Sequence, residues 1–411
     1  MSPAGVNPGA ARQERVRRWS GRVVLLAVVA LLAQAATFTL TDGLNGLVRE
    51  TRAERGRWGG AEDLARRSNE TRRWFTGSPV ASEDEPGGYL AYPPASFVLL
   101  WPLIGWLPFE AARGLWAAVS LTGLAWLSAL LVRYTRTHAG VPALAAAVLP
   151  FSLDGTRVCL ANGQLGVILL PAIVTGIVML GRDDRGWRGD LPGALLVLGA
   201  LVKPPFAAPF VVVALFTPRR WRPAAIVAGG YVGLTLLALA FQRGSPFAYL
   251  ERWLRSSAHS LVAPRGSANL ASWLTLAGRG EWVVPASVLA LAALAVWLRR
   301  HRDADVWLLL GVTGVAARIW TYHWGHDDVL ILLPIVALVR IAAEPAFSWP
   351  TRGTAVALLV ATWASVAGLY WQWGLSRIPG YADARGAVWL LVLVFLASQA
   401  ARSRVTLRVA G

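Results

Sequence analysis

The chain has 411 residues, of which 55% are hydrophobic and only 15% are charged. A soluble protein of this size carries about 25% charged residues, and the apolar residues here form runs close to the roughly 20 that cross a bilayer, so a soluble globular protein is excluded. The net charge of +17 comes from basic clusters between apolar runs, which is typical of cytoplasmic loops beside membrane lipids and not of a nucleic-acid-binding surface. The single cysteine, Cys159, excludes an intramolecular disulfide.

The predicted fold is an all-α polytopic membrane protein with about twelve transmembrane helices, within a range of about 10 to 13. Basic residues fill residues 1–22, and an apolar run follows over 23–40. We therefore expect cytoplasmic tails at 1–22 and 403–411 around one transmembrane domain, 23–402, in the plasma membrane of a bacterium. Ala33-Gln34-Ala35 resembles a small-residue cleavage site, so a cleaved signal peptide is the alternative.

The polar segment 41–94 is expected to form a large loop outside the cytoplasm. Asp63, Arg67 and Glu70 lie at i, i+4 and i+7 within it, and a helix would place all three on one face. Near a helix N-terminus a carboxylate stays ionised and can take a proton from a hydroxyl group, so Asp63 is a candidate general base. Asp42, at the end of the first span, is the rival base. A surface helix with ordinary ion pairs is the alternative interpretation of the loop.

Two topologies are open for the next part of the chain. In the preferred one, 89–132 makes one net crossing with its Pro-rich segment 92–108 re-entrant, and 191–217 is a hairpin broken at Lys203-Pro204-Pro205. In the other, 89–132 crosses twice and 191–217 crosses once. Lys203 is the only lysine in the chain, which suggests a site that needs an ammonium group. Snorkelling of that lysine at the membrane interface is the alternative.

Two further motifs carry polar side chains. Asn162-Gly163-Gln164 opens an apolar run, and a plain helix start is the alternative to a binding role for this motif. After a second external loop, 242–281, His323 and Asp327 lie at i, i+4, so the carboxylate could fix the tautomer of the imidazole. Arg318 could bind a phosphate group through two hydrogen bonds. A belt of interfacial aromatic residues is the alternative.

In the preferred topology these polar groups gather on one side of the membrane. Ionisable side chains at membrane depth are costly, and they usually mark functional sites. The predicted catalytic residue is Asp63 or Asp42, and no metal or other cofactor is expected. The predicted substrate-binding residues are Arg67, Glu70, Tyr92, Asn162, Gln164, Lys203, Asn269, Arg318, Tyr322, His323, His326 and Asp327.

The ordered motifs resemble those of glycosyltransferase family 87, the polyprenol-phosphate-mannose-dependent mannosyltransferases of the C-type membrane glycosyltransferase superfamily. The likeness covers residues 60 to about 340 and rests on Asp63-Leu64 with Arg67 and Glu70, Thr76-Gly77-Ser78-Pro79, Tyr92-Pro93-Pro94, Asn162-Gly163-Gln164, Lys203-Pro204-Pro205, and Tyr322-His323 with Asp327. The resemblance implies a C-type glycosyltransferase fold. It also implies that Asp63 is the base and that Lys203, Arg318 and His323 hold the phosphate or the sugar of the donor.

We accordingly expect transfer of a sugar, with mannose favoured, from a polyprenyl-phosphate donor to an extracytoplasmic glycolipid or glycan by one inverting displacement. A monophosphate leaving group beside Arg and Lys does not require a metal. Two other interpretations remain. One is a transporter or flippase for a lipid-linked sugar, which needs a polar path through both leaflets. The other is a catalytically inactive membrane assembly protein.

Overall fold

The computed structural model describes residues 8–48, 60–78, 80, 92–135, 140–181, 187–216, 221–251, 253, 268–368, 378 and 380–402. These residues form helices and connecting turns without any strand, which confirms the predicted all-α class. The elements are α1 (Pro8–Val48), α2 (Glu62–Phe75), α3 (Pro94–Leu100), η1 (Trp101–Gly105), α4 (Phe109–Tyr134), α5 (Gly140–Val148), η2 (Leu149–Ser152), α6 (Asp154–Asn162), α7 (Gly166–Leu180), α8 (Trp187–Ala200), α9 (Pro204–Phe216), α10 (Trp221–Leu239), α12 (Leu270–Leu276), η3 (Gly280–Trp282), α13 (Val283–Arg300), α14 (Val306–Ile319), η4 (Gly325–Ile331), α15 (Leu332–Ala343), α16 (Trp349–Val366) and α18 (Tyr381–Arg402).

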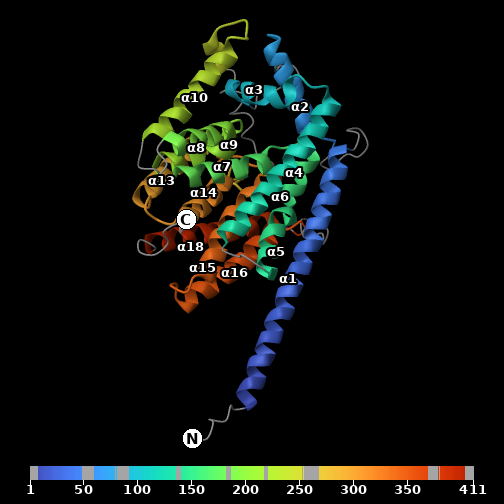
Figure 1. Cartoon of the computed structure of the whole chain (residues 1–411). Helices are drawn as coiled ribbons and strands as arrows, with labels where there is room; N and C mark the ends of the chain where they lie inside the picture. Colours follow the sequence, from blue (N-terminus) through green and yellow to red (C-terminus); the bar gives the residue numbers. More distant parts are fainter. Residues whose placement is uncertain are drawn as a thin grey trace.

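Helix α1 is longer than the apolar run, residues 23–40, from which the first span was predicted. In Figure 1 the first part of α1 extends past the other helices, and its second part lies against them. The helix continues to Val48, so residues 41–48, which were predicted to open the external loop, belong to α1. Thr41 fits within the helix because its hydroxyl group donates to the carbonyl of Thr37, 2.7 Å away. This part of the loop prediction was wrong.

Five described helical segments are long and apolar enough to cross a membrane, namely Ala27–Val48, Phe109–Tyr134, Trp221–Leu239, Gly280–Arg300 and Tyr381–Ala400. The pair α6 and α7 would make a sixth span, but it is bent by 117° at its break. Four apolar segments of 10–17 residues are shorter than a full span: Pro94–Gly105, Pro142–Ser152, Pro204–Phe216 and Val306–Ile319. The chain is therefore a membrane protein, while the expected count of about twelve spans is not confirmed.

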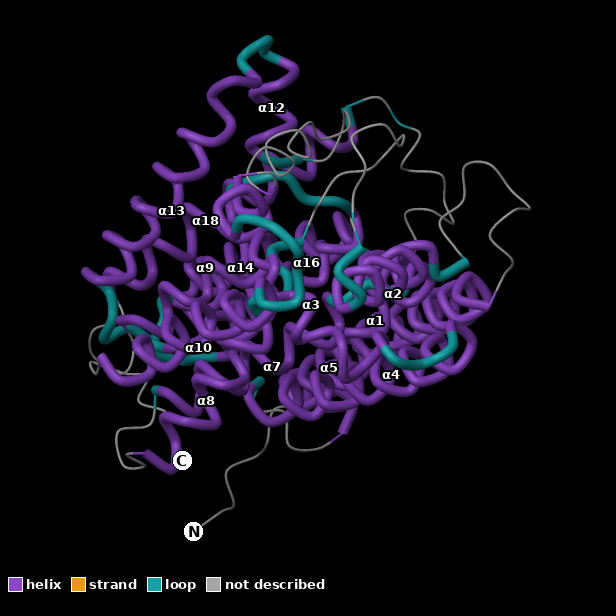
Figure 2. Tube along the Cα trace, turned by 90° about the horizontal axis from the view of Figure 1, so that it is seen from above, coloured by secondary structure: helices purple, strands orange, loops and turns teal. Residues whose placement is uncertain are grey.

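The most buried helices are short, and two of them, α14 and α15, are mostly apolar. All nine residues of α6 are buried, as are 13 of the 14 residues of α14 and eight of the 12 residues of α15. A helix that is apolar all round belongs in the interior and not at a polar surface. Viewed from above in Figure 2, α4 lies at one side of the molecule and α13 at the opposite side, with α7, α9 and α14 between them.

The long apolar segment 191–217 is interrupted where the two prolines predicted. Helix α8 ends at Ala200 and α9 begins at Pro204, with turns between them. Proline lacks a backbone N–H and disfavours a helical conformation at the preceding residue, so Lys203 cannot continue α8 through Pro204. The predicted break is confirmed, and the direction in which its two arms enter the membrane stays a prediction.

Candidate active site

Asp63 lies in the first turn of α2, as the spacing of Asp63, Arg67 and Glu70 predicted. Two backbone hydrogen bonds hold the start of this helix. Gly60 N–H donates to the carbonyl oxygen of Gly46 at 2.6 Å, and Ala61 N–H donates to the carbonyl oxygen of Ala161 at 3.1 Å. Asp63 Oδ2 accepts a hydrogen bond of 2.6 Å from Gln164 Nε2. This hydrogen bond holds the Asp63 carboxylate against the bend between α6 and α7.

Gln164 reaches Asp63 because the chain bends sharply between α6 and α7. Gly163 ends α6 with a φ of 68°, and the backbone N–H of Gln164 donates to the carbonyl oxygen of Cys159 at 2.8 Å. A Cβ at Gly163 would lie 2.5 Å from Leu64 Cβ, so only glycine lets α2 approach this closely. The alternative that Asn162-Gly163-Gln164 begins a helix was wrong. The motif ends α6, since Asn-Gly at the end of a helical pattern favours a left-handed C-terminal cap.

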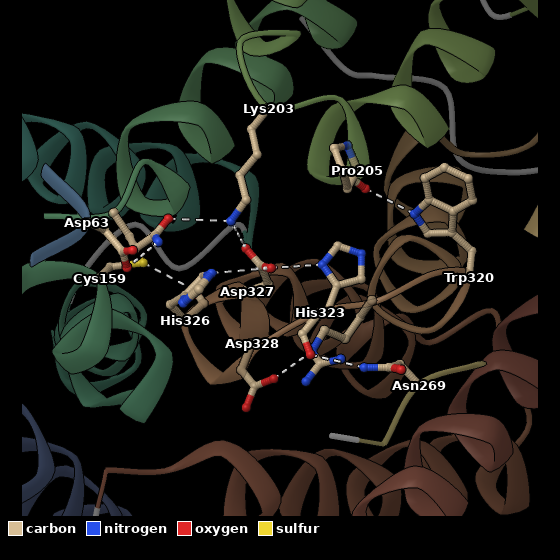
Figure 3. A network of polar contacts seen from close by, with 12 residues as sticks. Asp63, Cys159, Lys203, Pro205, Asn269, Trp320, His323, His326, Asp327 and Asp328 are labelled. Atoms are coloured by element: carbon tan, nitrogen blue, oxygen red, sulfur yellow. Dashed lines mark hydrogen bonds and ion pairs between the residues drawn. The ribbon is translucent and has the colours of Figure 1, made fainter. Parts of the chain in front are cut away.

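Lys203 occupies the break between α8 and α9 and points at the same site. Its Nζ lies 2.6 Å from Asp327 Oδ1 and 3.5 Å from Gln164 Oε1. Figure 3 shows Lys203 reaching down between Asp63 on one side and Asp327 on the other. The lysine is therefore engaged inside the protein, and the snorkelling alternative does not describe it.

Two histidines lie beside Asp327, which belongs to η4. His326 also belongs to η4, and His323 lies just before it. His323 Nδ1 is 2.8 Å from Asp327 Oδ2, and His326 Nε2 is 3.6 Å from the same oxygen. A carboxylate paired with Lys203 only accepts hydrogen bonds, so Nδ1 of His323 carries the proton and Nε2 keeps its lone pair. Nε2 of His323 is buried without a hydrogen-bond partner among the described residues. The predicted tautomer-fixing contact between His323 and Asp327 is confirmed.

Arg67 and Glu70 form a buried ion pair on the face of α2 that carries Asp63. Arg67 also lies over the ring of Tyr92, with 4.5 Å between the guanidinium carbon and the ring centre. Burial raises the pKa of Glu70 above its usual value, and the neighbouring Arg67 opposes that rise. Helix α2 is therefore docked into the protein by charged side chains, unlike a surface helix with ordinary exposed ion pairs.

Arg318 is bound to the protein and not exposed. Its Nε donates to Asp328 Oδ1 at 2.6 Å, and Arg385 of α18 pairs with the other oxygen of Asp328. Both guanidinium groups lie 4.9 Å from the ring of Trp389. This cluster anchors η4, which carries Asp327, to α18. Whether Arg318 also touches a phosphate stays a prediction.

Three other predicted binding residues lie around this centre. Asn269 begins α12 and donates from Nδ2 to the carbonyl of His323 at 3.0 Å, so it supports the histidine. Tyr322 stacks on His323 with ring centres 6.4 Å apart. Asn162 is the buried last residue of α6. Their roles in binding stay predictions.

The rival base Asp42 is neutralised by an arginine that sequence reasoning missed. Arg157 donates from Nη1 to Asp42 Oδ2 and from Nε to Asp154 Oδ1, each at 2.7 Å. The i, i+3 spacing of Asp154 and Arg157 could have indicated this pair, but the helix α6 that carries them was not foreseen. Asp42 is thus engaged in an ion pair inside the protein, and the choice between Asp42 and Asp63 as the base stays a prediction.

The described residues contain no group of three or more His, Cys, Asp or Glu side chains that could hold a metal ion. The side chains that the site brings together are the Asp63 carboxylate, the Lys203 ammonium group and the His323–Asp327 pair. A carboxylate that can accept a proton lies one glutamine side chain away from an ammonium group that can bind an anion.

The model of glycosyltransferase family 87 matches residues 89–320, more than half of the 411 residues. This chain belongs to glycosyltransferase family 87. The family makes it a membrane glycosyltransferase, with a sugar donor and an acceptor as substrates. No curated protein and no solved structure matches the chain.

The matched range of the family 87 protein includes Tyr92, Gln164, Lys203 and Arg318 but neither Asp63 nor His323. Figure 3 shows Asp63 and His323, which come from either side of that range, close to Lys203, which lies within it. The resemblance to the family is confirmed, while the roles of the individual site residues stay predictions.

Proposed function

We propose that this family 87 glycosyltransferase moves a sugar from a polyprenyl-phosphate donor to a hydroxyl group of a glycolipid or glycan outside the cytoplasm. The observation that carries the proposal is the link from Asp63 through Gln164 to Lys203. A carboxylate and an ammonium group at the separation that one glutamine side chain spans support a proton acceptor and a phosphate-binding cation in one site. Mannose is the favoured sugar because of the family resemblance.

Lys203 has a hydrogen-bond donor to spare for a phosphate. An ammonium group has three N–H bonds, and two of them are directed at Asp327 and Gln164. The third can donate to an oxygen of the donor phosphate. As the bond between the anomeric carbon and the phosphate oxygen breaks, negative charge grows on the phosphate, so the cation stabilises the transition state more than the ground state.

Asp63 supplies the other half of the displacement. Its Oδ2 is held by Gln164, and its Oδ1 accepts no hydrogen bond from the described residues. The acceptor hydroxyl group gives its proton to Asp63 while its oxygen attacks the anomeric carbon from the face opposite the phosphate. The polyprenyl phosphate leaves with the bonding electron pair, and the configuration at the anomeric carbon is inverted. Asp63 then releases the proton to water.

The test is transfer of radiolabelled sugar from polyprenyl-phosphate mannose, glucose or arabinose in membranes that hold equal amounts of each variant. Asp63→Asn keeps the size of the side chain and the contact to Gln164, so we expect it to lower transfer by at least about 100-fold. Asp42→Asn, the matched control, is expected to retain transfer within about fivefold, because Arg157 already neutralises Asp42.

The two variants also separate the alternatives. Transfer that survives in Asp63→Asn but is lost in Asp42→Asn would move the base to Asp42. Wild-type membranes that transfer no sugar from any of the three donors would favour a transporter of a lipid-linked sugar or an inactive assembly protein. Retention of configuration in the product would contradict the single displacement.

A further inference from the structure

Trp116 in α4 is buried with its indole N–H unused. The residue is 2% exposed, and its Nε1 has no hydrogen-bond partner among the described residues. Two other buried tryptophans are satisfied, since Trp74 donates to Ala238 at 2.8 Å and Trp389 donates to Ser365 at 3.1 Å. An unpaired buried donor is costly unless a water molecule or a ligand accepts its hydrogen bond.

Trp116 lines a small cavity beside the proposed base. The cavity has a volume of about 10 Å³ and is lined by Asp63, Arg67, Tyr92, Trp116, Gly163 and Gln164, with three leucines completing the wall. Its volume is close to that of a single water oxygen, and its lining is polar enough to bind one. A sugar ring cannot enter, so a carbohydrate could only present one hydroxyl group to this space.

Most polar groups around the cavity are already engaged. Arg67 is paired with Glu70, and Gln164 donates to Asp63 Oδ2. The groups that remain open in the described part of the chain include the donor Nε1 of Trp116, the hydroxyl group of Tyr92 and the acceptor Oδ1 of Asp63. A hydroxyl oxygen is both an acceptor and a donor, so a single hydroxyl group or water can satisfy Trp116 Nε1 and Asp63 Oδ1 together.

We propose that this cavity is a hydroxyl subsite in which Trp116 selects and orients the acceptor. In the resting protein one water molecule accepts from Trp116 Nε1 and donates to Asp63. A hydroxyl group of the carbohydrate acceptor displaces that water, accepts the same indole N–H and gives its proton to Asp63. The assignment of the ligand as an acceptor hydroxyl rests on the proposed function, whereas the bound water does not.

The first arm of the test is kinetic. Trp116→Phe keeps an aromatic ring and removes the N–H, so the KM for the acceptor is expected to rise about 10-fold, equivalent to the loss of one hydrogen bond, with the KM for the donor unchanged. Trp126→Phe is the matched control, because Trp126 lies on the same helix and is 37% exposed. We expect this control to match the wild type in both constants and in melting temperature.

The second arm of the test does not require that the protein transfers a sugar. In a cryo-EM map of the unliganded wild type that resolves water, density is expected within hydrogen-bond distance of both Trp116 Nε1 and an oxygen of Asp63, and it should vanish in Trp116→Phe. A dry cavity, or a protein side chain bonded to Nε1, overturns the subsite. Equal changes in the donor and acceptor constants overturn the role of Trp116 in acceptor binding. If the wild type transfers no sugar, the proposed function fails, while the density still decides the subsite.

Discussion

Lys203 Nζ lies 2.6 Å from Asp327 Oδ1, although 124 residues separate the two in the chain. The pair is buried, with side-chain exposures of 12% for Lys203 and 3% for Asp327. Desolvation makes a buried ion pair a poor source of net stability, but the loss of one partner leaves an uncompensated charge. The pair fixes the break between α8 and α9 against η4, and it therefore sets the distance from the ammonium group to the His323–Asp327 pair.

The first prediction separates the structural from the catalytic role of this ion pair. Lys203→Met leaves the Asp327 carboxylate without its ammonium partner, which should lower the free energy of unfolding by about 3–5 kcal/mol. The double variant Lys203→Met/Asp327→Asn removes both charges and should regain much of that loss. Neither variant should transfer sugar, because the phosphate has lost its cation. Melting temperature and transfer per folded protein measure the two effects.

The control for this prediction is a buried ion pair outside the site. Arg340 on α15 donates from Nη2 to Asp305 Oδ2 at 2.9 Å, and the two side chains are 12% and 1% exposed. Arg340→Met should cost comparable stability while the folded fraction keeps its transfer activity. If Lys203→Met also transfers sugar at the wild-type rate per folded molecule, Lys203 does not act on the donor.

The second prediction concerns the approach of α2 to the bend between α6 and α7. At Gly163, alanine would have to adopt a φ of 68° and place its Cβ 2.5 Å from Leu64 Cβ. The left-handed conformation costs about 1–2 kcal/mol, and the steric overlap adds about 1–3 kcal/mol. Gly163→Ala should therefore lower both the melting temperature and transfer, because Leu64 is the neighbour of Asp63.

Gly199→Ala is the matched control for the substitution at Gly163. Gly199 lies within α8, and a Cβ built there meets no atom within 4 Å. Alanine in a helix should be neutral or stabilising by up to about 1 kcal/mol. Equal melting temperatures for Gly163→Ala and the wild type would show that α2 can move away from Gly163 without cost.

Sequence patterns that involve only a few neighbouring residues predicted part of the site correctly. The i, i+4, i+7 spacing placed Asp63, Arg67 and Glu70 on one helix, and two prolines broke the chain after Lys203. Each of these inferences depends only on backbone geometry within a few residues. The contact between His323 and Asp327 belongs to the same class, because both residues come from one short segment.

Features that depend on long-range packing were not predictable in this way. No local pattern shows that Arg385 meets Asp328 or that Trp116 lines a cavity with Asp63. The helix α6 was missed because its polar residues Asp154 and Arg157 interrupt the apolar run that hydropathy detects. The expected count of about twelve spans is not confirmed, since several apolar runs in the described part of the chain form helices too short to cross a bilayer alone.

The third prediction concerns Asp328, which joins η4 to α18. Asp328→Asn removes the charge that Arg318 and Arg385 share, so two guanidinium groups would face each other across Trp389 without a carboxylate. The expected loss in the free energy of unfolding is about 3–5 kcal/mol. Asp383→Asn, at an exposed position of α18, should leave the melting temperature unchanged. Equal stability of both variants would show that Asp328 does not anchor η4.

The fourth prediction is a pH dependence that arises from Glu70. Burial holds the pKa of this carboxyl group above its usual value of 4.5, while Arg67 opposes that rise. Arg67→Met removes the opposing charge, so the pKa of Glu70 in the folded protein should rise further. A carboxyl group whose pKa is higher in the folded than in the unfolded state destabilises the fold when it is ionised. The variant should therefore be less stable than the wild type at pH 8, by about 3–5 kcal/mol.

This deficit should shrink as the pH falls through the raised pKa of Glu70 and should largely vanish near pH 4.5, where the carboxyl group is protonated in the folded state and half protonated in the unfolded state. Melting temperatures of the detergent-solubilised variant and wild type between pH 4.5 and 8 measure the trend. Arg113→Met is the control, because Arg113 pairs with the 71% exposed side chain of Glu110 on α4 and is not among the charges that act on Glu70. A deficit for Arg67→Met that stays constant over this range would mean that Arg67 stabilises α2 through its contact with Tyr92 and not through the charge of Glu70.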